Sequence, residues 1–449
     1  MLAAGLSARK NWYTLKGFRV RTQRHYRKYQ DAANQGAVEV LKEISIYIEF
    51  AVVAVFAFFY SLISGRLEKL PVSAPIVFVL VGLLLGPLGL GWFRGDVSRE
   101  TFRVLVDITL VLILFIDAAS SNTSVLRSAF RIPTRMLLLG LPGSIALGGL
   151  VAWLLFDSLS LYECAILGTI LAATDAALGK AVITNPDVPA PLREGLNSES
   201  GLNDGFCVPI LLVFIALAMG QSGEGSDIRP LMLVAEEVGV GAMVGVVVVS
   251  VAAWLLKCSV RLGWISPVWI QIAVPAVAVS CFAIAQSIHG SGYIAAFVGG
   301  MFFGVLTGDS THKLVMPGEG VAEALAMLTW LIFGIAVIGQ IAPSFTWEIV
   351  LYSLLSLTVI RMLPVFISLA GTGESSVNKL FLGWFGPRGL ASIVFAIMVF
   401  NANIPGSKTI SAVVACTVAM SLILHGISAN PLASRIGSKQ ADLGDGSTS

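Results

Sequence analysis

Long apolar stretches separated by short polar loops dominate the hydropathy pattern of this chain. An apolar run of about 20 residues is long enough to cross the hydrocarbon core of a bilayer as a helix. The pattern therefore predicts about thirteen membrane-spanning helices and no soluble domain of useful size. They are expected at residues 45–64, 72–91, 102–119, 136–156, 161–184, 194–219, 232–256, 267–288, 291–307, 323–341, 347–370, 379–400 and 409–429.

The two ends of the chain fall outside this pattern. A run of Lys and Arg in residues 1–43 precedes the first acid, Asp31. Three interpretations of it stay open: a basic arm at the membrane surface, an Arg-rich organelle transit peptide, or a translation start placed too far upstream. Residues 431–449 are expected to form a short, disordered polar tail. The predicted domains are thus a basic N-terminal arm (1–43), a transmembrane domain (44–430) and a polar C-terminal tail (431–449).

Composition supports a polytopic membrane protein. Of the 449 residues, 56% are hydrophobic and 12% are charged, with a mean hydropathy of +0.84. Soluble domains carry about 25% charged residues. The net charge of +2 gives no indication of a nucleic-acid partner. We expect an all-α, multi-pass protein embedded in lipid, in the plasma (inner) membrane, or in an organelle membrane if the N-terminal segment is a transit peptide.

Two acids interrupt the apolar runs where a bilayer tolerates few charges. Asp175 lies inside the run 161–184, and Asp204 lies inside the run 194–219. A carboxylate at the bilayer centre costs about 2.5–3.5 kcal/mol on insertion scales, so an acid in this position usually has a function. Two such acids on neighbouring helices of a hairpin can form one site.

The polar block around the second acid covers two faces of one helix. It reads Glu199-Ser200-Gly201-Leu202-Asn203-Asp204-Gly205. Glu199 and Asn203 are four residues apart and share one helix face, and Ser200 and Asp204 share the adjacent face. A solvated helix start is the alternative interpretation. Asp204, however, lies at least one turn beyond the last clearly exposed residues.

These groups offer an all-oxygen site. The carboxylates of Asp175 and Asp204, with oxygens of Ser200 and Thr174, suit a hard cation such as Na⁺. Burial disfavours the ionised form of a carboxyl, so an empty site would hold a proton and a bound cation would expel it. Cation and proton then compete for Asp204 and Asp175, which is an exchange mechanism. The ions are substrates, and we expect no cofactor and no catalytic residue.

Two further charges are informative. Arg388 lies in Gly386-Pro387-Arg388-Gly389 within an apolar span, where an unpaired guanidinium would be costly, and we expect Glu199 to be its partner. The glycines and proline also predict an interrupted helix, as in an inverted repeat whose broken helices cross. Asp117 ends the span 102–119. It either caps that helix near the membrane surface or faces the access route of the cation.

At these residues the chain resembles the cation:proton antiporter family 1, the electroneutral sodium/proton exchangers. The resemblance rests on Thr174-Asp175, on the block from Glu199 to Gly205 and on Gly386-Pro387-Arg388-Gly389, in this order and spacing. It covers roughly residues 45–430. It implies the inverted-repeat antiporter fold, with a core domain that moves against a dimerising scaffold domain. A homodimer is therefore expected.

The resemblance also implies roles for the residues of the ion site. Asp204 would bind the ion and carry the proton. Asp175, Ser200 and the main chain of Thr174 would complete the coordination, which places Na⁺ between the two acids.

The same resemblance implies a supporting polar network. Glu199 would pair with Arg388, Asn203 would support that pair, and Asp117 would help the ion through water, although the family often has Glu there. One position departs from the family pattern, because Ala176 stands where a proline commonly follows the Thr-Asp pair. The helix interruption at this point must then come from packing.

The ion and the transport class are less constrained. The Asn of the Asn-Asp pair favours electroneutral exchange, since the sister family with an Asp-Asp pair tends to be electrogenic. A K⁺/H⁺ antiporter on the same scaffold is the close alternative, because nothing in the sequence sets the cavity size. A channel would need a filter segment, a Na⁺-coupled solute symporter would need a roomier polar cavity, and an intramembrane aspartyl protease would need Gly-x-Gly-Asp. We therefore favour a transporter over an enzyme.

Overall fold

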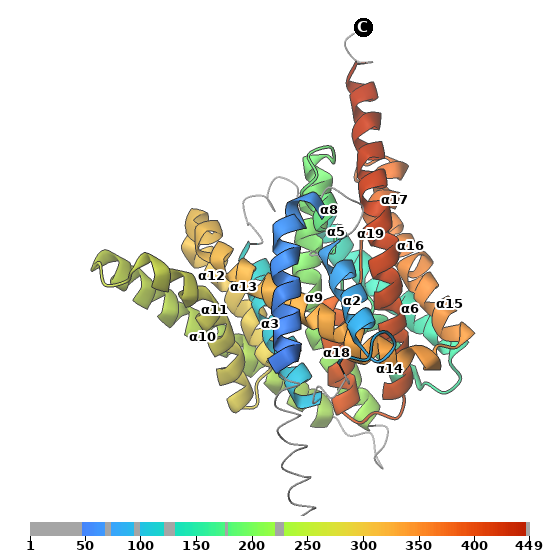
Figure 1. Cartoon of the computed structure of the whole chain (residues 1–449), viewed down its shortest axis with the longest axis horizontal. Helices are drawn as coiled ribbons and strands as arrows, with labels where there is room; N and C mark the ends of the chain where they lie inside the picture. Colours follow the sequence, from blue (N-terminus) through green and yellow to red (C-terminus); the bar gives the residue numbers. More distant parts are fainter. Residues whose placement is uncertain are drawn as a thin grey trace, which may run out of the picture. The chain divides into compact units, whose positions relative to one another are not determined.

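The computed structural model describes residues 47–67, 73–93, 99–120, 131–175, 178–220 and 229–445. Within these ranges all regular structure is helical (Figure 1). The chain divides into two compact units, residues 1–65 and 66–449. The basic arm expected at residues 1–43 lies outside the described residues. The apolar helix Tyr47–Leu67, which is long enough to cross a membrane, lies almost entirely in the first unit.

The second unit contains the remaining helices. In chain order they are α2 (Ala74–Leu85), α3 (Arg99–Ser120), α5 (Arg131–Arg135), η1 (Met136–Gly140), α6 (Leu141–Leu155), α7 (Leu161–Ile170), α8 (Lys180–Ile183), α9 (Ala190–Gly220), α10 (Arg229–Arg261), α11 (Pro267–Ser287), α12 (Gly292–Thr307), η2 (Gly308–Ser310), α13 (Thr311–Ile332), η3 (Phe333–Ile338), α14 (Gly339–Ile341), η4 (Ala342–Ser344), α15 (Trp347–Leu357), α16 (Val359–Ser368), α17 (Ser376–Trp384), α18 (Leu390–Asn401) and α19 (Ser407–Asp445).

The prediction of an all-α multi-pass membrane protein is confirmed. In the described ranges, 8 helices are long and apolar enough to cross a membrane, and shorter apolar helices accompany them. Each span predicted from the sequence overlaps one or more helices of the structure. The shorter apolar helices include α7 and α18, each of which covers only part of its predicted span. Both predicted spans are therefore interrupted.

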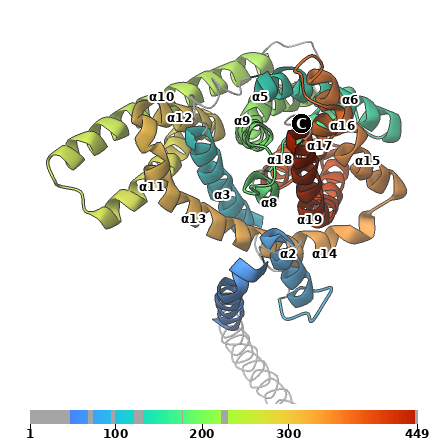
Figure 2. The same ribbon diagram turned by 90° about the horizontal axis from the view of Figure 1, so that it is seen from above.

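Two groups of helices form the second unit. Helices α3 and α10 to α13 lie on one side and α15, α16, α17 and α19 on the other, with α9 and α18 near the middle (Figure 2). In the first group α12 lies directly on α3, because Gly300 and Gly304 face the backbone of Phe115 and Ala119. A Cβ at either glycine would overlap a carbonyl oxygen. Small residues at this spacing let two membrane helices approach closely.

The C-terminal segment corrects one expectation. Helix α19 continues to Asp445, so residues 431–445 extend a helix and the expected disorder is wrong for them. Ala433 and Ile436 are buried in an apolar cluster that includes Leu192 and Leu196 of α9. This packing stabilises the helical turns that follow the predicted membrane span.

The two interrupted spans contact each other at their breaks. The first break separates α7 from α8, and the second separates α17 from α18. The backbone N–H of Asp175 donates to the carbonyl of Pro387 at 2.8 Å, and the hydroxyl of Ser392 donates to the carbonyl of Ile170 at 3.0 Å. The expected pair of broken, crossing helices is therefore present, and the candidate residues lie on it.

Candidate functional site

Side chains from α9 and from the second break bind the free carbonyls of the first break. The three successive carbonyls of residues 172–174 leave the α7 hydrogen-bond pattern and accept bonds from Asn203 (3.0 Å), Arg388 (2.8 and 3.0 Å) and Ser200 (2.8 Å). Buried carbonyls need such partners. The helix therefore ends without a proline, and packing causes the interruption, as the departure at position 176 led us to expect.

The second break supplies Arg388, whose expected partner is wrong. Its side chain is 0% exposed, and Nη1 donates to the carbonyls of Ala172 and Ala173 while Nη2 lies 3.5 Å from that of Ser356. No bond to Glu199 exists in the described structure. The C-terminal end of a helix carries a partial negative charge. Carbonyls just beyond the end of α7 therefore bind Nη1 of this guanidinium in place of a carboxylate.

The partner of Glu199 is Arg361 of α16. Arg361 Nη1 donates to Glu199 Oε1 at 2.7 Å, and Nη2 donates to Oε2 at 2.9 Å. This is a bidentate ion pair, whose charge-assisted hydrogen bonds are stronger than those between neutral groups. Both residues are 1% exposed. Asn203 adds a bond to Glu199 Oε1 at 3.2 Å, so it supports the acid as expected, although with a different arginine. Arg361 is not among the residues that the sequence led us to expect at this site. Its signal was a lone basic residue within the apolar span 347–370.

Asp175 caps the second half-helix. Its Oδ2 accepts the backbone N–H of Leu390, the first residue of α18, at 3.0 Å. A helix N-terminus carries free N–H groups and a partial positive charge, so a carboxylate is stabilised there. Arg388 has the opposite role after α7, because its positive charge binds the free carbonyls there. The first break thus contributes the acid at the start of α18, and the second break contributes the base at the end of α7.

Asp204 lies on α9, one turn after Ser200. The residue is 7% exposed, and its Oδ1 has no hydrogen-bond partner in the part of the chain that the structure describes. The carboxyls of Asp175, Asp117 and Glu199 are close enough to interact with it electrostatically. An unpaired carboxylate oxygen in an apolar interior is costly, so its retention is typical of a binding group.

Asp117 approaches this group from α3. A Cβ at Gly201 would lie 3.3 Å from the Asp117 Cβ, so the aspartate packs directly against the polar face of α9. In the described ranges no three His, Cys, Asp or Glu side chains gather as a metal site would require. A cation held here would therefore rely on two acids and on neutral oxygens. The residues expected to form the ion site and its polar network are all brought to one region.

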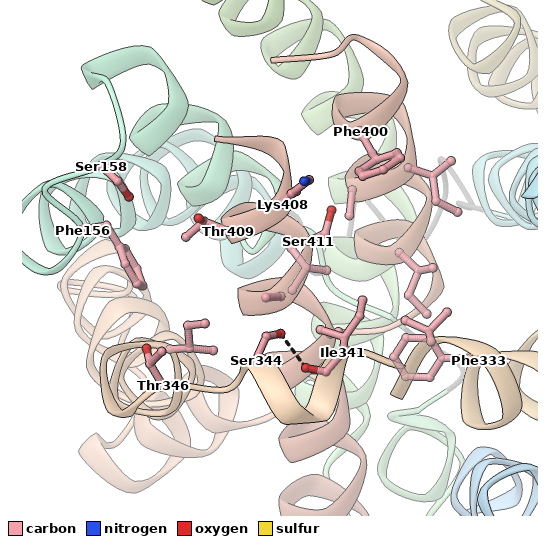
Figure 3. Close-up of a pocket in the computed structure, with 18 of the residues that line it drawn as sticks. Phe156, Ser158, Phe333, Ile341, Ser344, Thr346, Phe400, Lys408, Thr409 and Ser411 are labelled. Carbon is pink, nitrogen blue, oxygen red and sulfur yellow. Dashed lines mark hydrogen bonds between the residues drawn. The ribbon is translucent and has the colours of Figure 1, made fainter. Parts of the chain in front are cut away.

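A separate cavity of about 880 Å³ lies among α15, α18, α19 and η3 (Figure 3). Its lining combines aromatic rings such as Phe156 and Phe400 with polar groups such as Lys408 and Ser411. Asp117, Asp175 and Asp204 are not among the lining residues. The acids, rather than this cavity, therefore define the candidate site.

Gly389→Ala is expected to disrupt the site. A Cβ at this position would overlap the Asp175 carboxylate, which therefore must leave the N-terminus of α18. We expect lower thermal stability and weaker cation-dependent activity in proteoliposomes. Gly239→Ala is the matched control, since a helical glycine there has nothing within 4 Å of the added Cβ. Equal behaviour of the two variants would contradict the close contact between Gly389 and Asp175.

The sequence matches a known protein family, and its fold resembles that of a solved structure. The family model described as "Sodium/hydrogen exchanger, transmembrane" matches residues 52–435. A similar fold occurs in the solved sodium proton antiporter MjNhaP1 from Methanocaldococcus jannaschii, with a TM-score of 0.68 and 20% identity. That match covers 85% of this chain and 99% of the other. At this identity the likeness concerns the fold.

Sequence relatives carry names with different cations. The K⁺/H⁺ antiporter NhaP of Alkalimonas amylolytica is 26% identical over 83% of this chain and 63% of its own length. The K⁺/H⁺ antiporter NhaP2 of Shewanella sp. (strain ANA-3) is 25% identical over 86% and 66%. A Na⁺/H⁺ antiporter of Saccharomyces cerevisiae is 27% identical over 42% of this chain and 20% of its own. The chain thus spans a little under two thirds of the NhaP relatives.

Proposed function

Because the chain belongs to the transmembrane sodium/hydrogen exchanger family, we propose that it exchanges a monovalent cation for protons across a membrane. The observation that carries this proposal is the Asp204 carboxyl, buried at mid-helix with Oδ1 unpartnered in the described part of the chain and with Asp175 nearby. Such an acid can hold either a cation or a proton. The protein acts in this proposal as a secondary transporter and not as an enzyme.

Competition at one site supplies the mechanism. Asp204 and Asp175 bind the cation, and Ser200 and the Thr174 carbonyl contribute neutral oxygens beside them. The Ser200 hydroxyl hydrogen points to the Thr174 carbonyl at 2.8 Å, which leaves the hydroxyl lone pairs for a ligand. When the cation leaves, burial favours the neutral carboxyl and Asp204 takes up a proton. Asp117, on α3, lies on the proposed access route.

The surrounding charges favour electroneutral exchange. Glu199 is neutralised by Arg361, Arg388 by the carbonyls that end α7, and Asp175 by the N-terminus of α18. Asp204 is then the group whose charge changes during the cycle. One proton exchanged for one monovalent cation moves no net charge. Asn203 fits this scheme, because its amide donates to neighbouring oxygens and does not titrate.

We propose Na⁺ as the cation, with Li⁺ as a possible substitute, and K⁺ as the alternative. The hard oxygen ligands suit all three ions, and the names of the relatives divide between K⁺ and Na⁺. By analogy with the family resemblance we also propose a homodimer, in which a core containing the two breaks moves against a scaffold. A plasma (inner) membrane location belongs to the same proposal.

Proton flux in proteoliposomes tests this function and names the ion. Purified protein is reconstituted with a pH-sensitive dye inside, and Na⁺, Li⁺ and K⁺ are added in turn, with the membrane voltage set by an ionophore. We expect cation-driven proton movement that does not depend on the voltage. Voltage-dependent movement would contradict the one-for-one stoichiometry. Folded protein with no cation-dependent signal would contradict exchange itself and favour a symporter or a channel.

A further inference from the structure

A polar stripe on α19 faces the second helix break. Ser421, His425 and Ser428 lie at spacings of four and three residues, so they share one face of the helix. Ser421 is 0% exposed and His425 is 2% exposed. The imidazole ring packs 5.2 Å from the ring centre of Trp384 and 6.4 Å from that of Phe385. Ser421 and His425 are therefore buried beside the second break, and the imidazole of His425 packs against the end of α17.

Hydrogen bonds connect this stripe to both ends of the break. The backbone N–H of Arg388 donates to Ser421 Oγ at 2.7 Å, and that hydroxyl lies 3.1 Å from His425 Nδ1. His425 Nε2 lies 2.9 Å from the carbonyl of Trp384, which ends α17. A carbonyl only accepts, so Nε2 must carry a hydrogen. Trp384 Nε1 in turn donates to Ser428 Oγ at 2.9 Å.

The same break is tied to Asp175 on its other side. The carbonyl of Pro387 accepts the Asp175 N–H at 2.8 Å, and the N–H of Leu390 donates to the Asp175 carboxylate at 3.0 Å. Arg388, between these two residues, is anchored by Ser421. The segment that carries Asp175's partners is thus held between Asp175 and α19. A shift of the segment away from α19 would move the hydrogen-bond donor of the carboxylate.

We propose that Ser421 and His425 are positioning residues that set the cation affinity of the site. They touch no proposed ligand atom, and they act through the backbone of residues 384–388 on the geometry of Asp175. The inference rests on the proposed cation site. Residues that orient the ligands of an ion typically change its affinity about 10–100-fold when substituted. Substitutions in the stripe should therefore change cation affinity, whereas substitutions of polar groups that only join two helices should change stability alone.

Helix α19 offers a control for that difference. Thr417 is also buried, one turn before Ser421, and its hydroxyl bonds Ser353 of α15 at 2.9 Å instead of the break. Thr417→Val removes this bond with little change in shape. If burial of polar groups in α19 mattered only for stability, this variant would resemble Ser421→Ala in every measurement.

The decisive experiment compares the KM for the driving cation in Ser421→Ala, His425→Phe, His425→Gln and Thr417→Val, in proteoliposomes. Ser421→Ala and His425→Phe are expected to raise KM about tenfold or more, because the break loses an anchor. His425→Gln keeps an N–H donor for the Trp384 carbonyl and is expected to restore most of the affinity. Thr417→Val is expected to keep the wild-type KM.

A parallel measurement separates this inference from the proposed function. The rise of the thermal unfolding midpoint with cation concentration reports binding without transport. Wild-type protein that binds the cation but moves no protons would contradict exchange, and the binding shifts of the variants would still decide the role of the stripe. Unchanged KM and unchanged binding in both Ser421→Ala and His425→Phe would overturn the inference.

Discussion

Asp204→Asn is expected to abolish cation-driven proton movement while leaving the protein folded. Asn has nearly the same shape as Asp, but it neither carries a negative charge nor takes up a proton. Because Asp204 Oδ1 accepts no hydrogen bond in the described part of the chain, the substitution removes no hydrogen bond from that atom. We therefore expect a near-normal unfolding temperature together with flux at the level of empty liposomes.

Asp107→Asn is a suitable control for this result. Asp107 is an acid of α3, and its Oδ1 accepts a hydrogen bond from the hydroxyl of Tyr293 at 2.7 Å, a bond that Asn can keep. It lies outside the proposed site, so we expect exchange to continue. Exchange retained in Asp204→Asn would mean that another group carries the proton and would refute the assignment of the site.

Arg361→Ala is expected to cause the largest loss of stability among the variants considered. The substitution leaves the Glu199 carboxylate buried and without its two-pronged partner. Removal of one member of a buried ion pair costs about 3–5 kcal/mol, because the other charge stays uncompensated. We expect a lower thermal unfolding midpoint in detergent and a lower yield of folded protein. Transport should fall accordingly.

Two comparisons identify the cause of that loss. The double variant Arg361→Met with Glu199→Met removes both charges, and it should recover much of the unfolding temperature, since replacing a whole buried pair by apolar groups is often tolerated. Arg103→Ala breaks a pair with Asp107 in which the arginine side chain is 51% exposed. Exposed pairs contribute about 0–1 kcal/mol, so this change should be mild. If Arg361→Ala were as stable as the wild type, the Glu199–Arg361 pair would have no structural importance.

Charged side chains connect the two breaks to each other. Arg388 binds carbonyls of the first break, and Asp175 binds the first N–H after the second. Both half-helices therefore end on a charged group contributed by the other. Neighbouring helices hold each break as well, because Ser200 of α9 bonds the Thr174 carbonyl and Ser421 of α19 accepts the Arg388 N–H.

The sequence by itself determined the class of protein and the place of its chemistry. Apolar runs about 20 residues long leave few structures other than membrane helices, and a carboxylate within such a run is too costly to be incidental. Asp175 and Asp204 were therefore predictable, and the glycines and proline of residues 386–389 predicted the second break. Their convergence followed from a family resemblance, and the structure places them side by side.

Only the tertiary structure decided which groups pair. The sequence offered Arg388 as the partner of Glu199, whereas Arg361 of α16 takes that place and Arg388 binds carbonyls. A lone histidine such as His425 likewise has no distinguishing pattern. Local periodicity tells which face of a helix a residue occupies. It does not tell which neighbouring helix that face meets, because partners across helices depend on packing between segments far apart in the chain.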